Sequence, residues 1–181
     1  MFRMSTIANF DESSELYFRN TELADLQFVL QLESIEDNKQ YIVPWEKNKH
    51  ESALAEQDKA HLIIVNRGTE QPVGFVIIAG LLNQNQSIEL VRIVIHEKGK
   101  GYGRTALKMI KKRVFDQLHA NRLWLDVKVN NHRAKQLYAS EGFSLEGTLR
   151  ECLKNDNQFE SLSIMSLLKS EYETIGDFYP N

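Results

Sequence analysis

The order of apolar and polar positions predicts short strands interspersed with a few helices. Strands are expected where β-branched and aromatic residues gather or alternate with polar ones, over residues 16–19, 61–66, 73–79, 87–96, 122–129, 143–154 and 159–168. Helices are expected over 22–34, 46–57, 103–118 and 132–141, mainly from apolar residues that recur every three to four positions. Thr21 stands where it can cap the first helix.

The order of these elements also predicts the fold class. Residues 61–66 and 73–79 form an expected antiparallel hairpin around 67–72, and a second hairpin follows from the turn at 155–158. Strands gather early and alternate with helices later, which favours an α/β fold with a single mixed, mostly antiparallel central sheet flanked by helices. The 181 residues suit one domain over 1–181, with 1–15 extended or poorly ordered.

Composition narrows the classes of function. No apolar run approaches the ~20 residues that cross a bilayer, and the first twenty residues lack the apolar core of a secretory signal, so a cytoplasmic protein with no membrane partner is expected. Cys152 is the single cysteine and the five histidines show no metal-ligand spacing, so no metal is expected. A net charge of −3 disfavours nucleic acid as a partner.

A glycine-rich segment between a predicted strand and a predicted helix carries the clearest chemical signal. Backbone N–H groups at such a junction point outward together and lie at the positive end of the helix dipole, which suits a phosphate or pyrophosphate. Nearby cationic side chains could neutralise the same anion. The candidate cofactor-binding residues of this segment are Lys98, Gly99, Lys100, Gly101, Tyr102, Gly103 and Arg104.

A second motif turns this signal into a resemblance to a family. Residues 131–138 read Asn-x-x-Ala-x-x-Leu-Tyr and are followed by Gly142–Phe143, downstream of the glycine segment and one strand. Together the two motifs resemble the GCN5-related N-acetyltransferases (GNAT), in the branch of the ribosomal-protein N-terminal and spermidine acetyltransferases. Lys98 stands where the family usually carries Gln or Arg, so the positive charge is kept. The resemblance implies acetyl-CoA as co-substrate and a primary amine as acceptor.

The resemblance also implies how the cofactor is held. The strand before the glycine segment would offer the backbone of Ile93, Val94 and Ile95 to the pantetheine arm, as though the cofactor were an added half-strand. Asn131 stands where it can cap a helix and, by the resemblance, hydrogen-bond the cofactor.

Acetyl transfer to an amine needs an acid for the leaving thiolate and a base for the attacking ammonium. The resemblance puts Tyr138 beside the thioester sulfur, where its phenol can donate a proton. Glu89 is the candidate base, and the period of two along a strand places it on the face of Ile93 and Ile95, with Arg92 on the other face. Asp126 is the reserve, and water alone is the third choice.

Two other functions stay open from the sequence. A CoA-binding sensor or scaffold would keep the phosphate segment and do no chemistry, and a donor with a longer acyl chain would use the same site. The acceptor, a small molecule or a peptide, cannot be identified because its specificity would lie in loops 41–45 and 80–86. A homodimer is one expectation, since the terminal hairpin could pair with a second copy or stay free.

Overall fold

The computed structural model describes residues 13–155 and 157–178, the last four without their side chains. Most of the stretch 1–15, which the sequence suggests is extended or poorly ordered, lies outside this part, because the description begins at residue 13. The strands are β1 Leu16–Asn20, β2 Lys59–Asn66, β3 Gln71–Ala79, β4 Ser87–Ile95, β5 Arg122–Lys128, β6 Ser144–Asn155 and β7 Gln158–Leu168. The α-helices are α1 Leu26–Ser34, α2 Glu36–Lys39, α3 Lys47–Ala55, α4 Tyr102–Lys112, α5 His132–Ser140 and α6 Lys169–Phe178.

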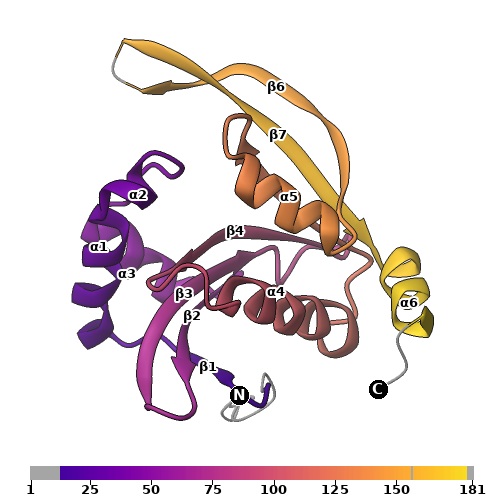
Figure 1. Cartoon of the computed structure of the whole chain (residues 1–181), viewed down its shortest axis with the longest axis horizontal. Helices are drawn as coiled ribbons and strands as arrows, with labels where there is room; N and C mark the ends of the chain where they lie inside the picture. Colours follow the sequence, from indigo (N-terminus) through magenta and orange to yellow (C-terminus); the bar gives the residue numbers. More distant parts are fainter. Residues whose placement is uncertain (1–12, 156, 179–181) are drawn as a thin grey trace.

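The strands form one mixed sheet, in the order β1-β2-β3-β4-β5-β7-β6 (Figure 1). Every neighbouring pair is antiparallel except β4 and β5. The parallel pairing of β4 with β5 covers only Ser87–Glu89 against Arg122–Trp124. Beyond this short contact the two strands part, and the sheet opens in its middle. The predicted fold class and both predicted hairpins are confirmed.

Apolar side chains pack on both faces of the sheet. One core joins β1–β5 and β7 to α4, through Ala106, Leu107 and Ile110 of the helix. The other core joins β2, β3 and β4 to α1, through Val29 and Leu32. The branched residues of β2 and β3 are buried on both faces, as expected for strands covered by helices on each side.

A bulge in β4 changes which residues share a face. Ile77 of β3 lies opposite Arg92, whereas Ile78 lies opposite Leu90, so Val91 is an extra residue in β4. The expected placement of Glu89 with Ile93 and Ile95, opposite Arg92, is therefore wrong. Ile93 and Ile95 pack against the α4 core, while Arg92 turns toward α1.

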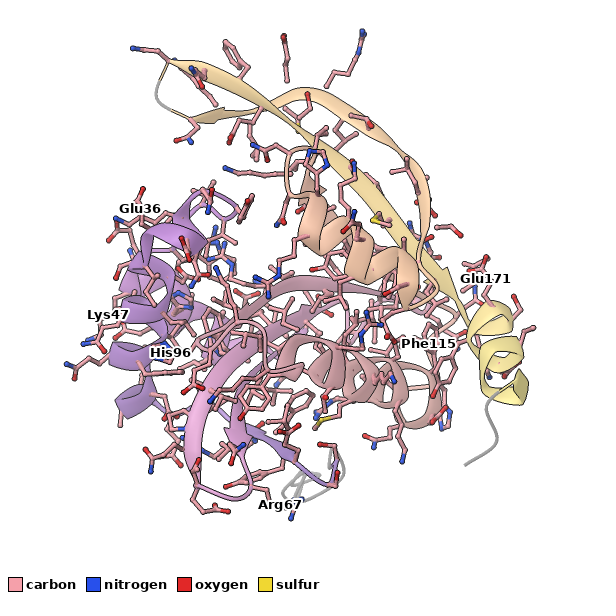
Figure 2. The ribbon with its side chains drawn as sticks, in the orientation of Figure 1. Glu36, Lys47, Arg67, His96, Phe115 and Glu171 are labelled. Atoms are coloured by element: carbon pink, nitrogen blue, oxygen red, sulfur yellow. The ribbon has the colours of Figure 1, made fainter. Side chains whose placement is uncertain are left out.

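Four local features of the structure differ from the expectations. The first helix begins with a 3-10 turn, Leu23–Asp25, capped by Glu22 rather than Thr21, and the chain from Tyr102 to Lys112 continues as a π-helical turn over Arg113–Gln117. Helix α2 has four residues, too few to show a periodicity. Helix α6 was not predicted; its Tyr172 stacks on Phe115 with ring centroids 4.8 Å apart, and Phe115 lies on the side of the body nearest α6 (Figure 2).

Candidate active site

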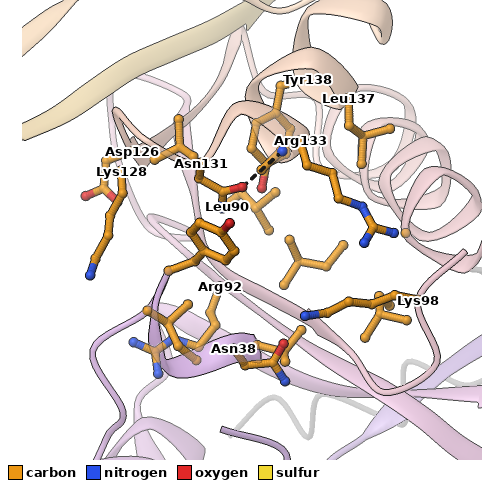
Figure 3. Close-up of a pocket in the computed structure, with 18 of the residues that line it drawn as sticks. Asn38, Leu90, Arg92, Lys98, Asp126, Lys128, Asn131, Arg133, Leu137 and Tyr138 are labelled. Carbon is orange, nitrogen blue, oxygen red and sulfur yellow. Dashed lines mark hydrogen bonds between the residues drawn. The ribbon is translucent and has the colours of Figure 1, made fainter. Parts of the chain in front are cut away.

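The parting of β4 and β5 opens a cleft of about 1060 Å³. It is bounded by β4, the start of α4, the face of α5 and the segment from α2 to Trp45, with Leu153 and Leu162 from the terminal hairpin (Figure 3). Within the described residues, β4 has no strand partner on this side beyond Glu89. The backbone of Ile93, Val94 and Ile95 therefore borders the cleft along an edge that an extended ligand can pair with.

The glycine segment closes one end of the cleft. Gly99 and Gly101 have φ values of +87° and +83°, and Gly101 is the residue immediately before α4. A Cβ at either position would meet nothing within 4 Å. Glycine is therefore favoured at these two positions by the positive φ of the backbone and not by a lack of space for a side chain. The first amides of α4 have no intrahelical acceptor. An anion can approach them through the open space in front of the glycines.

The cationic side chains near this end differ in what they contact. Lys98 lines the cleft and donates to the carbonyl oxygen of Asp37 at 3.0 Å, and burial lowers the pKa of its ammonium group. Lys100 pairs with exposed Glu97 and is not among the lining residues. Arg104 lines the cleft, yet its guanidinium is 2.5 Å from the Glu141 carboxylate.

Arg133 is a lining residue that the sequence motif did not single out. It is the second residue of α5, and its guanidinium reaches into the same side of the cleft as Lys98 (Figure 3). Within the described residues it makes no hydrogen bond or ion pair, and its charge contributes to the lowered pKa of Lys98. Its position inside Asn-x-x-Ala was a signal in the sequence, but charge alone did not separate it from other exposed arginines.

Helix α5 carries Asn131 and Tyr138 to the wall of the cleft. Asn131 caps the helix, because its Oδ1 accepts from the Ala134 amide at 3.1 Å. Tyr138 packs against Phe143 with ring centroids 5.8 Å apart, and only 8% of its surface is exposed. Burial, and then the charge of Asp126, raise the pKa of Tyr138 to about 12, so the phenol is protonated at neutral pH. Tyr102, at the start of α4, lines the cleft, and its hydroxyl oxygen accepts a hydrogen bond from Asn66 Nδ2 at 3.1 Å.

Two carboxyl groups face the cleft where β4 and β5 part. Glu89 is half-buried, and both burial and the charge of Asp126 raise its pKa. Asp126 is exposed as a residue, but its carboxyl group lies within the cleft, where partial desolvation raises its pKa too. The described residues contain no group of three or more His, Cys, Asp or Glu side chains that could hold a metal ion.

These features together indicate a class of protein. A splayed parallel strand pair, an open helix N-terminus and a buried tyrosine beside two carboxyl groups suit group transfer from a phosphorylated carrier. A model of the acetyltransferase (GNAT) family matches residues 24–143, and the chain belongs to this family.

Known relatives agree with this assignment. Spermidine N(1)-acetyltransferase of Vibrio cholerae is 26% identical over 170 residues, which cover 88% of this chain and 96% of that protein. A putative ribosomal protein bS18-alanine N-acetyltransferase of Bacillus subtilis is 27% identical over 148 residues, or 80% of this chain and 90% of that protein. The crystal structure of the Vibrio cholerae spermidine N-acetyltransferase in complex with CoA and spermine has a TM-score of 0.79 at 24% identity, covering 89% of this chain and 99% of that one.

The predicted activity is confirmed at the level of the reaction. The protein is an acetyl-CoA-dependent N-acetyltransferase that transfers an acetyl group to an amine. None of the described helices combines the length and apolar character needed to cross a membrane.

Proposed function

We propose that one end of the cleft holds the phosphates of acetyl-CoA and the middle carries out the transfer. The observation that supports this most is that Tyr138, the unpaired edge of β4 and the carboxyl groups of Glu89 and Asp126 line the same cleft. The lining of the cleft fits the cofactor because it offers open amides, a free strand edge and two cations, Lys98 and Arg133, on one side. When bound, acetyl-CoA supplies the activated acetyl thioester.

Each candidate group has one task in this scheme. The amides of 99–104, with Gly101 at the helix start, bind the diphosphate, and the backbone of Ile93–Ile95 orients the pantetheine arm. Glu89 accepts the ammonium proton through a water, since a carboxylate with a raised pKa is a better base. The neutral amine then attacks the carbonyl carbon, the C–S bond breaks and the Tyr138 hydroxyl donates its proton to the thiolate. The proton that the acylated nitrogen loses restores the phenol.

The side chains of Lys100 and Arg104 take a smaller part in this scheme than the sequence suggested. Lys100 is outside the lining, and the charge of Arg104 is compensated by Glu141. Asn131 keeps its two expected roles, of which the cap is visible and the contact with cofactor is proposed. We also keep the single domain, the cytoplasmic location and the homodimer as predictions; β6 ends the sheet with Leu145 and Leu149 exposed.

The acceptor is proposed from the names of the relatives, which point to a polyamine and to a protein N-terminus. Spermidine and an alanine-initiated peptide are therefore the first probes, followed by a wider panel of amines. Release of free thiol from acetyl-CoA reports turnover. Longer acyl-CoA thioesters in the same assay test donor preference.

A Tyr138→Phe variant tests the chemistry. If Tyr138 is the acid, turnover falls by about 100-fold or more while the affinity for acetyl-CoA, measured by calorimetry, stays within about twofold. Tyr17→Phe is the matched control, because Tyr17 lies outside the cleft and donates to Glu70. Unchanged turnover in Tyr138→Phe removes the role, and a wild-type protein that binds acetyl-CoA without acetylating any amine would be the sensor instead.

A further inference from the structure

Glu33 of α1 is a fully buried carboxylate with no place in the chemistry above. Only 1% of its surface is exposed. Burial pushes the pKa of Glu33 upward, but His50, Arg92 and the Trp45 amide outweigh it, so its pKa lies below the usual value. The side chain is therefore charged at neutral pH. A buried charge of this kind is retained only where its partners are well placed.

Three of the partners of Glu33 belong to different parts of the chain. Its Oε1 pairs with the Arg92 guanidinium of β4. Its Oε2 accepts from the backbone amide of Trp45 at 2.7 Å and lies 3.5 Å from Nε2 of His50. One carboxylate thus joins α1, β4 and the segment that leads into α3.

Behind Glu33, two buried histidines form a rigid support. Nδ1 of His50 is 3.1 Å from Nε2 of His61, and Nδ1 of His61 is 2.9 Å from the Thr21 hydroxyl. Burial lowers the pKa of His61 to about 4, so this ring is neutral at physiological pH. Both rings pack around Phe75, with centroids 6.1 and 5.6 Å from it. These packed rings lie directly behind the carboxylate, with His50 as the ring nearest to it.

In front of Glu33, its partners form a wall of the cleft. Arg92 also donates to the carbonyl oxygen of Val43 at 2.9 Å, and its guanidinium lies 4.7 Å from the Trp45 ring. Val43, Trp45 and Arg92 all line the cleft, and Arg92 lies on the side of Asp126, away from Lys98 (Figure 3). Residues 43–46 belong to no helix or strand, so these contacts replace the support that regular structure gives elsewhere.

We propose that Glu33 is a positioning residue for the acceptor, because its carboxylate fixes Arg92 and the segment 43–45 as one wall of the acceptor end of the cleft. It touches neither reacting atoms nor cofactor. Loss of its charge loosens the wall and weakens the use of the amine, whereas the cofactor end keeps its geometry. The inference rests on the proposed function: with the phosphates at the glycine segment and the transfer in the middle of the cleft, the amine occupies the opposite end.

Glu33→Gln is the test, because it removes the charge and keeps the shape. The acceptor KM, measured with spermidine or the alanine-initiated peptide, is expected to rise about tenfold. The dissociation constant for acetyl-CoA stays within about twofold. Glu36→Gln is the matched control on α2, since Glu36 is exposed at the outer surface of that helix (Figure 2) and should change neither constant. An acceptor KM unchanged in Glu33→Gln, or an equal loss of cofactor affinity, overturns the proposal.

A second variant covers the case in which Glu33→Gln does not fold. Arg92→Lys keeps a cation beside Glu33 but cannot also reach the Val43 carbonyl with a second donor. The acceptor KM is again expected to rise, by about threefold or more, with cofactor affinity unchanged. An acceptor KM equal to the wild-type value would overturn the proposal.

A fluorescence measurement separates this inference from the proposed function. The sequence contains two tryptophans, so Trp124→Phe leaves Trp45 as the single reporter. In that background, Glu33→Gln or Arg92→Lys should raise the acrylamide quenching constant of Trp45 about twofold or more, whether or not any amine is acetylated. Failure of acetyl-CoA binding would remove the proposed function; unchanged quenching in both variants, with cofactor bound, would remove only the role of Glu33.

Discussion

The two ends of the cleft are built in different ways. The end proposed to bind the phosphates, here called the phosphate end, comes largely from one continuous segment, residues 95–104, and offers backbone amides and two glycines with positive φ. The proposed acceptor end comes from side chains of β4, β5, the segment 40–45 and the terminal hairpin, with Glu33 of α1 paired to Arg92 behind them. A site formed by the backbone of one short segment can be predicted from the sequence. A site formed by side chains from distant segments becomes recognisable only in the folded structure.

The cationic side chains at the two ends also differ in whether they have acidic partners. At the phosphate end Lys98 and Arg133 face one side of the cleft, and within the described residues Arg133 has no acidic partner. At the acceptor end the charges of Arg92 and Lys128 are compensated by Glu33 and Glu160. Cations without acidic partners suit a mobile anionic ligand, while compensated pairs suit a fixed wall.

Acid should loosen the acceptor end first, because both buried histidines of the described residues lie behind it. The pKa of His61 falls from 6.5 to about 4 in the folded protein, so the unfolded state binds more protons between these values. The contribution of His61 to the free energy of unfolding is therefore fully present above pH 6.5. It is lost, by up to about 3 kcal/mol, as the pH drops toward 4. Urea unfolding at several pH values measures this, and His61→Gln should show a flatter profile. An equally steep profile in that variant would contradict the assignment.

Gly101→Val should damage the phosphate end and spare the acceptor end. A β-branched residue is strained at a φ of +83°, so the loop must change its backbone or bear the strain. The dissociation constant for acetyl-CoA is expected to rise about 100-fold in calorimetry. Gly147→Val is the control, since that Cβ also meets nothing within 4 Å and its φ is not positive. Similar losses in both variants would mean that the backbone conformation at Gly101 is unimportant.

Arg133→Gln should weaken cofactor binding by about tenfold, because one charged hydrogen-bonding group is lost from the phosphate end. The affinity of the wild-type protein should also fall with added salt more steeply than that of the variant. Lys100→Gln is the matched control and should change affinity less than twofold, since Lys100 is not among the lining residues and its charge is paired with Glu97. A larger loss of affinity for acetyl-CoA in Lys100→Gln than in Arg133→Gln would mean that Lys100, and not Arg133, binds the phosphates.

Asp126→Asn should produce the smallest change in activity of the variants considered. Asp126 lies between the two ends of the cleft, where the transfer is proposed to occur. The charge of Asp126, after burial, raises the pKa of Glu89, and Glu89 must be deprotonated to act as a base. Removing that charge lowers the pKa, so the acid limb of the kcat/KM profile moves to lower pH, while the plateau changes less than about threefold. A collapse of the plateau would make Asp126 the base in place of Glu89.

The bulge in β4 shows where periodicity stops being a guide. The alternation of residues located strand β4 correctly. However, the extra residue at Val91 puts each later side chain of the strand on the opposite face of the sheet from the one that strict alternation predicts. Arg92 therefore reaches Glu33, 59 positions earlier, instead of the opposite side of the sheet. No feature of residues 87–96 alone announces the bulge, because it arises from pairing with β3 and from the departure of β5.

Apolar spacing and glycine placement were enough to define the strands, the main helices, the fold class and the glycine turn before α4, because each depends on neighbours within a few residues. The histidines, Glu33 and Arg92 looked like scattered polar residues along the chain. Folding brings them together, since a buried carboxylate must find its partners among whatever elements pack around it. The geometry that receives the amine is thus a property of packing between elements, not of any one segment.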